Sequence, residues 1–354
     1  MIPESLVTEL RAIGPVRERE SLSRHTTVGI GGPADLYVKV ETVDALVRVL
    51  DAADRHAAPW FILGAGSNLL VGDGGIRGIV VEYDAKQIDG PVIQPDGRAR
   101  FTIEAGASFA YVARRLARQG YAGLEWAVGI PGTLGGAVVT NAGAYGSCLS
   151  DILVRVRLAK PGGAPRDLPA AAFQLSYRES VFTRGLLKQV AVLSVTVDLT
   201  PDDPAQVMER MNRLDTDRKA AQPSGQNTGS VFKNPPGDAA WRLIDAAGLR
   251  GHRLGGAEIT QKHSNFFANT GGATAADMHG LIRLAQQRVR DQFGVELEPE
   301  VWFVGEGFDH EPAALTPGPS PNPGRGETNA PMVDLGSPLR ASAGGGVGGG
   351  DRHP

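Results

Sequence analysis

Two segments of this 354-residue chain are unusually rich in glycine and small polar residues, and both could bind an anion. The first is LGAGSNLLVGDGG, from Leu63 to Gly75, and the second is GIPGTLGGAVVTNAGAYG, from Gly129 to Gly146. Glycine lets backbone N–H groups approach an anion closely and adopt positive φ, which builds a cradle for phosphate. The first segment lacks the third glycine of the dinucleotide fingerprint, and no P-loop lysine follows either one. The pattern therefore predicts a pyrophosphate cofactor, with tight turns and close helix–sheet contacts as the structural alternative.

Three shorter motifs place polar residues among apolar ones: LSYRESVF at 175–182, GSVFKNP at 229–235 and LEPEVWF at 297–303. Each has an ordinary structural interpretation when it is taken alone. Arg178 could pair with Glu179 or another surface acid, Ser230 could cap a helix, and Glu300 could be a solvated residue on a strand face. The motifs single out these three residues as catalytic candidates, and the alternatives stay open on residue type alone.

The elements that would position these motifs alternate between short strands and helices, which indicates an α+β protein with a boundary near residues 201–204. A helix late in the chain is the best marked, because Thr274 and Asp277 form a capping box and Gly294 ends the apolar stripe. The predicted strands are Trp60–Leu63, Gly78–Glu82, Phe101–Glu104, Val190–Leu199 and Val295–Val304, and the predicted helices are Val43–Ala53, Phe109–Arg118, a stretch after Pro201 carrying Val207, Met211 and Leu214, and the helix that follows Thr274.

Composition excludes several classes of protein. The formal net charge is −3 without a basic stripe, which argues against nucleic acid as the main partner. Cys148 is the only cysteine, so neither an intrachain disulfide nor a cysteine-based zinc site is expected, and we predict no metal. The first 20 residues lack an apolar signal core, and no stretch approaches the ~18 apolar residues that would span a bilayer. We expect a cytoplasmic protein without membrane insertion.

The last part of the chain changes character. Residues 310–354 hold a proline-rich run and a glycine-rich run. A segment of this composition buries too little apolar surface to offset its ordering entropy. We predict that residues 308–354 are a disordered tail.

The two glycine-rich segments together closely resemble the flavin-binding domain of the UDP-N-acetylenolpyruvoylglucosamine reductases, which have the vanillyl-alcohol-oxidase (PCMH) type of FAD-binding fold. The three shorter motifs resemble the same family and occur in its order, as do residues 24–35 and the segment GAEITQKHSNFF at 256–267. The likeness covers roughly residues 21–305 and looks like the shorter family type, which lacks a loop that covers the substrate. The resemblance implies a helical lead at 1–20, two α+β FAD-binding subdomains at 21–85 and 86–203, and an α+β substrate-binding domain at 204–307.

The resemblance also implies which residues hold the cofactor. FAD would be bound non-covalently, although His25 leaves covalent attachment as an alternative, because relatives with this fold attach FAD to a histidine. The residues implied for FAD are Gly64, Ala65, Gly66, Ser67, Asn68 and Leu69 at the pyrophosphate, and Gly129, Thr133, Gly135, Gly136, Asn141 and Ala144 along the rest.

The reaction that the resemblance implies is the NADPH-dependent, FAD-mediated reduction of the enolpyruvyl group of a UDP-sugar to give UDP-N-acetylmuramate for peptidoglycan. Hydride from flavin N5 would go to the vinyl carbon, and negative charge would collect beside the substrate carboxylate. Arg178 and Glu300 would stabilise that charge, and Ser230 would then donate the proton. Substrate binding would involve Tyr177, Lys233 and Asn234, with Lys219 a weaker candidate because the segment just upstream of Ser230 departs from the family pattern.

Two other functions fit part of the sequence. A sugar or alcohol oxidase could share the flavin loops, but it needs a base for a hydroxyl and not an acid for a carbanion. A non-catalytic flavin- or nucleotide-sugar-binding module could keep the loops without the three catalytic candidates. The shorter motifs favour the reductase over both.

Overall fold

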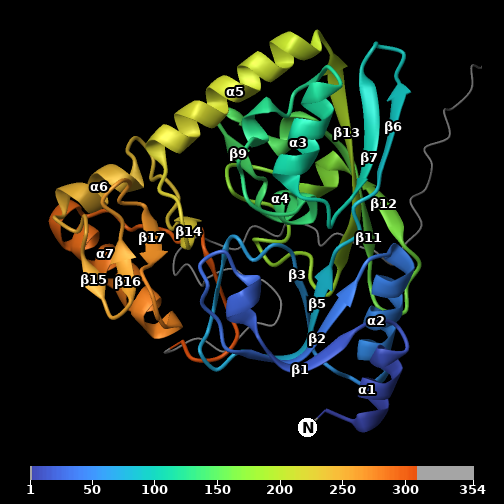
Figure 1. The fold of residues 1–354 in the computed structure, drawn as a ribbon, viewed down its shortest axis with the longest axis horizontal. Helices are drawn as coiled ribbons and strands as arrows, with labels where there is room; N and C mark the ends of the chain where they lie inside the picture. The colour runs from blue at the N-terminus through green and yellow to red at the C-terminus, as the bar shows by residue number, and fades with distance from the viewer. Residues whose placement is uncertain (1, 309–354) are drawn as a thin grey trace, which may run out of the picture.

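A four-stranded sheet begins the fold in the computed structural model, which describes residues 2–308 of the chain. Its strand order is β1-β2-β5-β3, with β1 antiparallel at one edge and the other three strands parallel. Helices α1 and α2 cover one face of this sheet (Figure 1). Helix α2 carries its apolar residues at helical spacing, so they form one stripe that packs into the core. The elements of this first subdomain are α1 (Glu4–Arg11), β1 (Val16–Ser21), β2 (Pro33–Val40), α2 (Val43–Arg55), β3 (Trp60–Leu63), β4 (Leu69–Val71) and β5 (Ile76–Tyr83).

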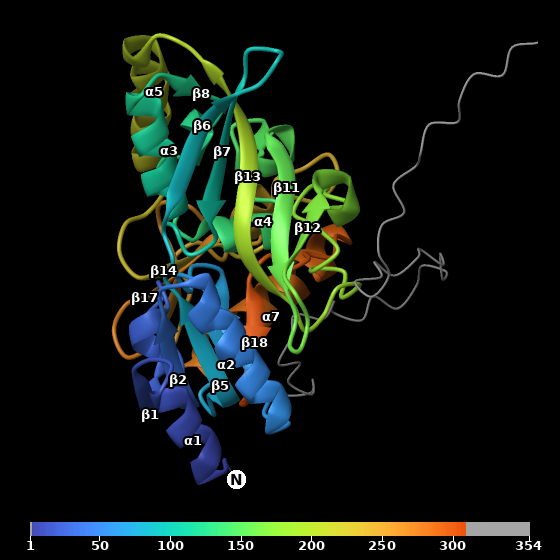
Figure 2. The ribbon, with the colours of Figure 1, turned by 90° about the vertical axis from the view of Figure 1, so that its right-hand side faces the viewer.

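A second, antiparallel sheet carries the second subdomain, with the order β12-β11-β13-β7-β6 and β8 paired to β13. Strand β13 lies at its centre and is buried from Ala191 to Leu199, where β-branched and apolar residues alternate with the buried polar residues Ser194, Thr196 and Asp198. Helices α3 and α5 lie together against one side of the sheet (Figure 2). The elements are β6 (Ile88–Ile93), β7 (Ala99–Glu104), α3 (Phe109–Arg118), β8 (Tyr121–Ala122), α4 (Leu134–Thr140), β9 (Gly143–Ala144), β10 (Ser147–Cys148), β11 (Leu153–Ala159), β12 (Arg166–Pro169), β13 (Ala191–Pro201) and α5 (Pro204–Ala221).

The C-terminal domain lies beside these two sheets and has its own core (Figure 1). The capping box at the start of α7 is present, since Thr274 Oγ1 accepts from Asp277 N at 3.0 Å and Asp277 Oδ2 accepts from Thr274 N at 3.0 Å. Gly294 ends that helix in the left-handed conformation, as predicted. The elements are β14 (Asn227–Ser230), α6 (Ala240–Ala246), β15 (Arg253–Leu254), β16 (Ala257–Ile259), β17 (Phe266–Asn269), α7 (Ala275–Phe293) and β18 (Trp302–Val304).

Backbone and side-chain bonds join the C-terminal domain to the first subdomain. Strand β18 pairs in parallel with β4, so the chain returns to the first subdomain at its end. The carboxylate of Asp73 accepts from the N–H groups of Ala275 and Ala276 at 2.9 and 3.0 Å. Asp73 therefore caps α7 from another domain, and its negative charge stabilises the positive N-terminal end of the helix dipole.

Four sequence expectations need correction. The helical lead at 1–20 is wrong in part, because α1 ends at Arg11 and Val16–Ser21 is a strand that pairs with β2. The strand expected over Val295–Val304 is limited to Trp302–Val304, since β4 has only three residues to pair with it. The buried residues of α5 belong to the core of the two sheets, so packing places α5 with the second subdomain and not after a boundary at residue 204. Phe308 packs against Phe303 and His279, so it belongs to the C-terminal domain and not to the predicted tail.

The other predicted helices and strands are confirmed, with ends shifted by a few residues. The tail predicted beyond Phe308 lies outside the described residues. Within residues 2–308, no helix is both long and apolar enough to cross a membrane.

Candidate functional site

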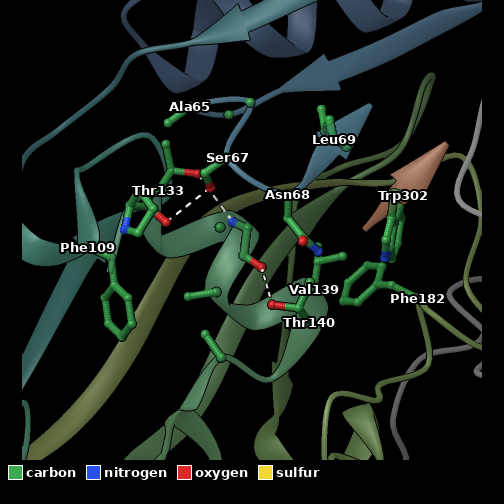
Figure 3. A pocket seen from close by; sticks show the side chains of 18 of the residues that line it. Ala65, Ser67, Asn68, Leu69, Phe109, Thr133, Val139, Thr140, Phe182 and Trp302 are labelled. Atoms are coloured by element: carbon green, nitrogen blue, oxygen red, sulfur yellow. Dashed lines mark hydrogen bonds between the residues drawn. The ribbon is translucent and has the colours of Figure 1, made fainter. Parts of the chain in front are cut away.

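A cavity of about 420 Å³ lies where the three parts of the fold meet. Its walls come from the loop after β3, the segment around α4, the start of β13, the end of β14 and the strand β18. Figure 3 shows Phe109 and Thr133 at one end and Phe182 and Trp302 at the other. Its size is typical of a small-molecule site.

The first glycine-rich loop turns sharply at the end of β3. Gly66 has a φ of +58°, and a Cβ there would lie 2.1 Å from the carbonyl oxygen of His25, so only glycine fits. In residues 2–308 we find no acceptor for the backbone N–H groups of the four residues Ala65 to Asn68. A run of free N–H groups on a cavity wall is an anion-binding arrangement.

The second glycine-rich segment forms the short helix α4 and the turn before it. Thr133 caps that helix by accepting from Gly136 N at 3.3 Å, and Gly135 packs against Ala105, where a Cβ would lie 3.0 Å from the alanine Cβ. A Cβ on Gly132 would lie 3.2 Å from Ser67 Oγ, and one on Gly136 would lie 3.6 Å from Thr133 Oγ1; both glycines line the cavity. The segment thus contains the expected close helix–sheet contact and, beside it, glycines on the cavity wall.

Arg178 and Glu300 form an ion pair on the cavity wall, 122 residues apart in sequence. Arg178 Nε lies 2.8 Å from Glu300 Oε1, but this N–H does not point at the oxygen and makes no hydrogen bond. The guanidinium is fixed at its other end, where Nη2 donates to the carbonyl of Gly143 at 2.7 Å. Burial raises the pKa of Glu300, and the opposing attraction of Arg178 and Lys233 does not cancel that shift. The arrangement favours a carboxyl group that stays protonated above its usual pH range.

Ser230 ends β14 beside this pair. It pairs with Phe266 of β17 and lines the cavity, and its hydroxyl has no partner in the described chain. The next residue, Val231, accepts from the backbone N–H of Glu300 at 2.7 Å, so the two catalytic candidates lie on adjacent segments. The helix-capping alternative for Ser230 is wrong, as is the pairing of Arg178 with Glu179, which faces Arg184 and Lys233.

The cavity does not contain every residue that the sequence singled out. Gly129 and Asn141 are not on its wall, and Asn141 is 2 % exposed. The remaining residues expected at FAD line it, namely Gly64, Ala65, Gly66, Ser67, Asn68, Leu69, Thr133, Gly135, Gly136 and Ala144.

The residues expected to bind substrate lie outside the cavity lining. Lys233 is held by Glu298 and Glu179, and the side chain of Asn234 accepts from Ala240 N at 3.0 Å at the start of α6. Tyr177 is 56 % exposed with its ring against Arg178, 5.3 Å from the guanidinium carbon.

Sequence reasoning missed Arg218. Its side chain lines the cavity without a hydrogen-bond acceptor among residues 2–308, whereas the neighbouring Lys219 is exposed and pairs with Asp215 at 2.8 Å. Burial lowers the pKa of Arg218, yet a guanidinium keeps its charge at neutral pH. The apolar stripe of α5 was the available signal, because Arg218 follows Met211 and Leu214 on the same face.

His25 does not reach the cavity. One ring nitrogen lies 3.0 Å from Glu20 Oε1 and the other 3.1 Å from the hydroxyl of Tyr37. Both nitrogens are therefore engaged, which disfavours covalent attachment of a flavin there. In the described part of the chain, no group of three or more His, Cys, Asp or Glu is arranged to hold a metal ion.

Comparison with known protein families finds a match in each half of the chain. Residues 34–168 match a family model described as an FAD binding domain, and residues 221–304 match one described as the C-terminal domain of UDP-N-acetylenolpyruvoylglucosamine reductase.

Whole proteins agree with these matches. The reductase of that name from Bacillus velezensis is 39 % identical over 310 residues, covering 85 % of this chain and 99 % of its own length. The one from Chloroflexus aggregans is 42 % identical over 292 residues, covering 82 % and 97 %. The crystal structure of the Thermus caldophilus reductase superposes with a TM-score of 0.69 at 34 % identity, covering 82 % of this chain and 99 % of that one. The shared region therefore includes the cavity and all three catalytic candidates.

Proposed function

The chain belongs to the UDP-N-acetylenolpyruvoylglucosamine reductase family, and we propose that it uses NADPH to reduce the enolpyruvyl group of UDP-N-acetylglucosamine enolpyruvate to UDP-N-acetylmuramate. This product is a precursor of peptidoglycan, so the proposal places the enzyme in cell-wall synthesis.

The observation that carries the proposal is the Arg178–Glu300 pair on the wall of the cavity, with Ser230 on the adjacent segment. A cation, a half-buried carboxyl and a free hydroxyl are the groups that an enol-ether reduction needs. An oxidase of alcohols or sugars would need a base in their place.

The N–H groups of residues 65–68 would hold the pyrophosphate of FAD, with Gly136 on the cavity wall beside them. Bound FAD would supply hydride taken from NADPH. We propose that NADPH and the UDP-sugar use the cavity in turn, which predicts ping-pong kinetics.

Arg178 and Glu300 would act on the charge that hydride addition creates. After the terminal vinyl carbon receives hydride, electrons collect on the neighbouring carbon and the carboxylate as an enolate. Arg178 would pair with that carboxylate, and Glu300, whose pKa is raised by burial, would donate a hydrogen bond to it in its protonated form. Both groups are held before the charge develops, which is the condition for electrostatic catalysis.

Ser230 would then protonate the carbanionic carbon. A serine hydroxyl is a weak acid, but an enolate is a strong base, so transfer is favourable when the geometry is right. Its hydroxyl makes no hydrogen bond within residues 2–308. Arg218 would bind phosphate groups of the substrate or of NADPH at the cavity wall.

Of the three residues first expected to bind substrate, Tyr177 remains the best placed. Its ring is exposed beside Arg178. The side chains of Lys233 and Asn234 already have partners within the protein, so we propose that they support the site through the backbone they hold.

Separate measurement of the two half-reactions tests the proposal. NADPH should reduce the bound flavin anaerobically, and the enolpyruvyl UDP-sugar should then reoxidise it. Ser230→Ala should leave the first step near the parent rate and slow the second, and Ser230→Cys should recover part of that second rate, because a thiol is a stronger acid. Ser224→Ala, at an exposed loop position, is the matched control. If the enolpyruvyl UDP-sugar does not reoxidise the flavin of the parent chain, the proposed function is wrong.

A further inference from the structure

We propose that Asn68 and Asn141, one from each glycine-rich segment, are positioning residues for the catalytic ion pair and not side-chain ligands of the cofactor. The inference rests on the proposed function, in which Arg178 and Glu300 act together. Each asparagine side chain binds the backbone that carries one member of the pair.

Asn68 holds the segment of Glu300. Its side-chain Nδ2 donates to the backbone carbonyl of Glu300 at 2.8 Å, and its backbone carbonyl accepts from the N–H of Trp302 at 3.0 Å. On the other side, the N–H of Glu300 donates to Val231. The backbone at Glu300 is thus fixed from the flavin loop and from the strand that carries Ser230. Loss of the Asn68 amide would remove the bond to the carbonyl of Glu300 and leave the backbone bonds of Trp302 and Val231 in place.

Asn141 holds the turn that presents Arg178. Ser176 and Glu179 exchange backbone hydrogen bonds at 3.1 and 3.2 Å, so Tyr177 and Arg178 occupy the tip of a tight turn. Arg178 has a φ of +56°, a strained conformation for a residue with a side chain. Such a conformation persists when the surroundings fix it.

The amide of Asn141 supplies that constraint. Its Nδ2 donates to the carbonyl of Ser176 at 2.8 Å, and its Oδ1 accepts from Ser150 N at 3.1 Å. Two residues later, the carbonyl of Gly143 receives the guanidinium of Arg178. One short stretch after α4 therefore fixes both the backbone and the charged end of Arg178.

The chemistry of the amides argues against a direct cofactor role. Asn141 is 2 % exposed, lies behind the cavity wall and has both ends of its amide engaged. Asn68 reaches the cavity, but one N–H of its amide donates to the carbonyl of Glu300, and its amide oxygen cannot accept from a phosphate oxygen. The backbone N–H of Asn68 stays free for an anion, so loop and side chain have separate tasks.

Two variants test the inference. Asn68→Ala removes the amide that holds Glu300. Asn141→Gly removes the amide that holds Ser176, and glycine accepts the φ of +44° found at position 141 without strain. The matched control is Asn269→Ala. The amide of Asn269 donates across a domain interface to the backbone carbonyl of Val28 at 3.1 Å and does not contact Arg178 or Glu300.

The readouts separate positioning from cofactor binding. Fluorescence titration of FAD into the flavin-free variants should give affinities within about twofold of the parent, and NADPH should reduce the bound flavin at near the parent rate. Reoxidation by the enolpyruvyl UDP-sugar should slow by about tenfold or more in both variants and stay near the parent rate in the control, because small misplacements of reacting groups are costly.

A double-mutant cycle gives the decisive result. If Asn68 acts through Glu300, then Asn68→Ala should slow reoxidation by less than about twofold in a Glu300→Gln background. Effects that multiply would overturn the inference, as would a large loss of FAD affinity with normal reoxidation of the loaded enzyme. Parental reoxidation in both asparagine variants would overturn it while the proposed function stands. A parent that the enolpyruvyl UDP-sugar fails to reoxidise would overturn both.

Discussion

Replacement of Arg178 by lysine keeps the positive charge but should lower turnover by about 10²-fold or more. The guanidinium makes two contacts through different atoms, Nε at 2.8 Å from Glu300 and Nη2 at 2.7 Å from the carbonyl of Gly143. A lysine has one nitrogen and cannot reach both sites while it also faces a substrate carboxylate.

The size of the effect follows from what is lost. One hydrogen bond to a charged group is worth ~1.5–3 kcal/mol, which corresponds to a rate factor of ~10–150 when the contact forms in the transition state. Removal of one preorganised donor to a developing oxyanion costs ~10²–10³ in rate. The loss should appear when the enolpyruvyl UDP-sugar reoxidises the flavin, because the negative charge develops in that half-reaction.

Stopped-flow absorbance of the flavin measures this directly. Arg178→Lys should be reduced by NADPH at near the parent rate, and its reoxidation by the enolpyruvyl UDP-sugar should reach a much lower limit at saturating substrate. Arg184→Lys is the matched control, since Arg184 lies in the same segment and bonds to Gln174 and Glu179 outside the cavity. An unchanged limiting rate with a raised KM would refute the reasoning and make Arg178 a simple binding residue.

Three more outcomes are expected. Because burial raises the pKa of Glu300 and the protonated form is the proposed donor, reoxidation should slow as pH rises through that raised pKa, and Glu300→Gln should give a slower rate without this limb in a pH–rate profile. Asp73→Ala should lower the free energy of unfolding by ~1–3 kcal/mol, because Ala275 N and Ala276 N lose their cap. A thermal melt would show this as a loss of several degrees in melting temperature. An unchanged melting temperature would mean that water replaces the carboxylate. Truncation after Phe308 should leave the melting temperature near that of the full chain. Truncation after Gly307 should lower it, because the ring of Phe308 packs on the C-terminal core. Equal melting temperatures of the two truncated chains would show that this contact adds no stability.

Local patterns in the sequence were sufficient for several elements. The helix Phe109–Arg118 has the predicted bounds, and the capping box at Thr274 and the glycine at 294 delimit α7 as expected. These signals involve residues within a turn or two of each other, so their physics does not depend on the rest of the fold. The family and its FAD-binding domain were also predictable, because glycine-rich loops and short polar motifs keep their order along the chain.

Contacts between distant residues could not be predicted in this way. A strand such as Val16–Ser21 exists because β2 offers it an edge, and its own sequence is mostly polar. In the same way, the ion pair of Arg178 with Glu300 prevails over the adjacent Glu179 because the C-terminal domain brings its strand to the cavity. The type and spacing of residues named the groups that can react, whereas tertiary structure decided which of them meet, because hydrogen bonds and burial depend on neighbours in space and not on neighbours in the chain.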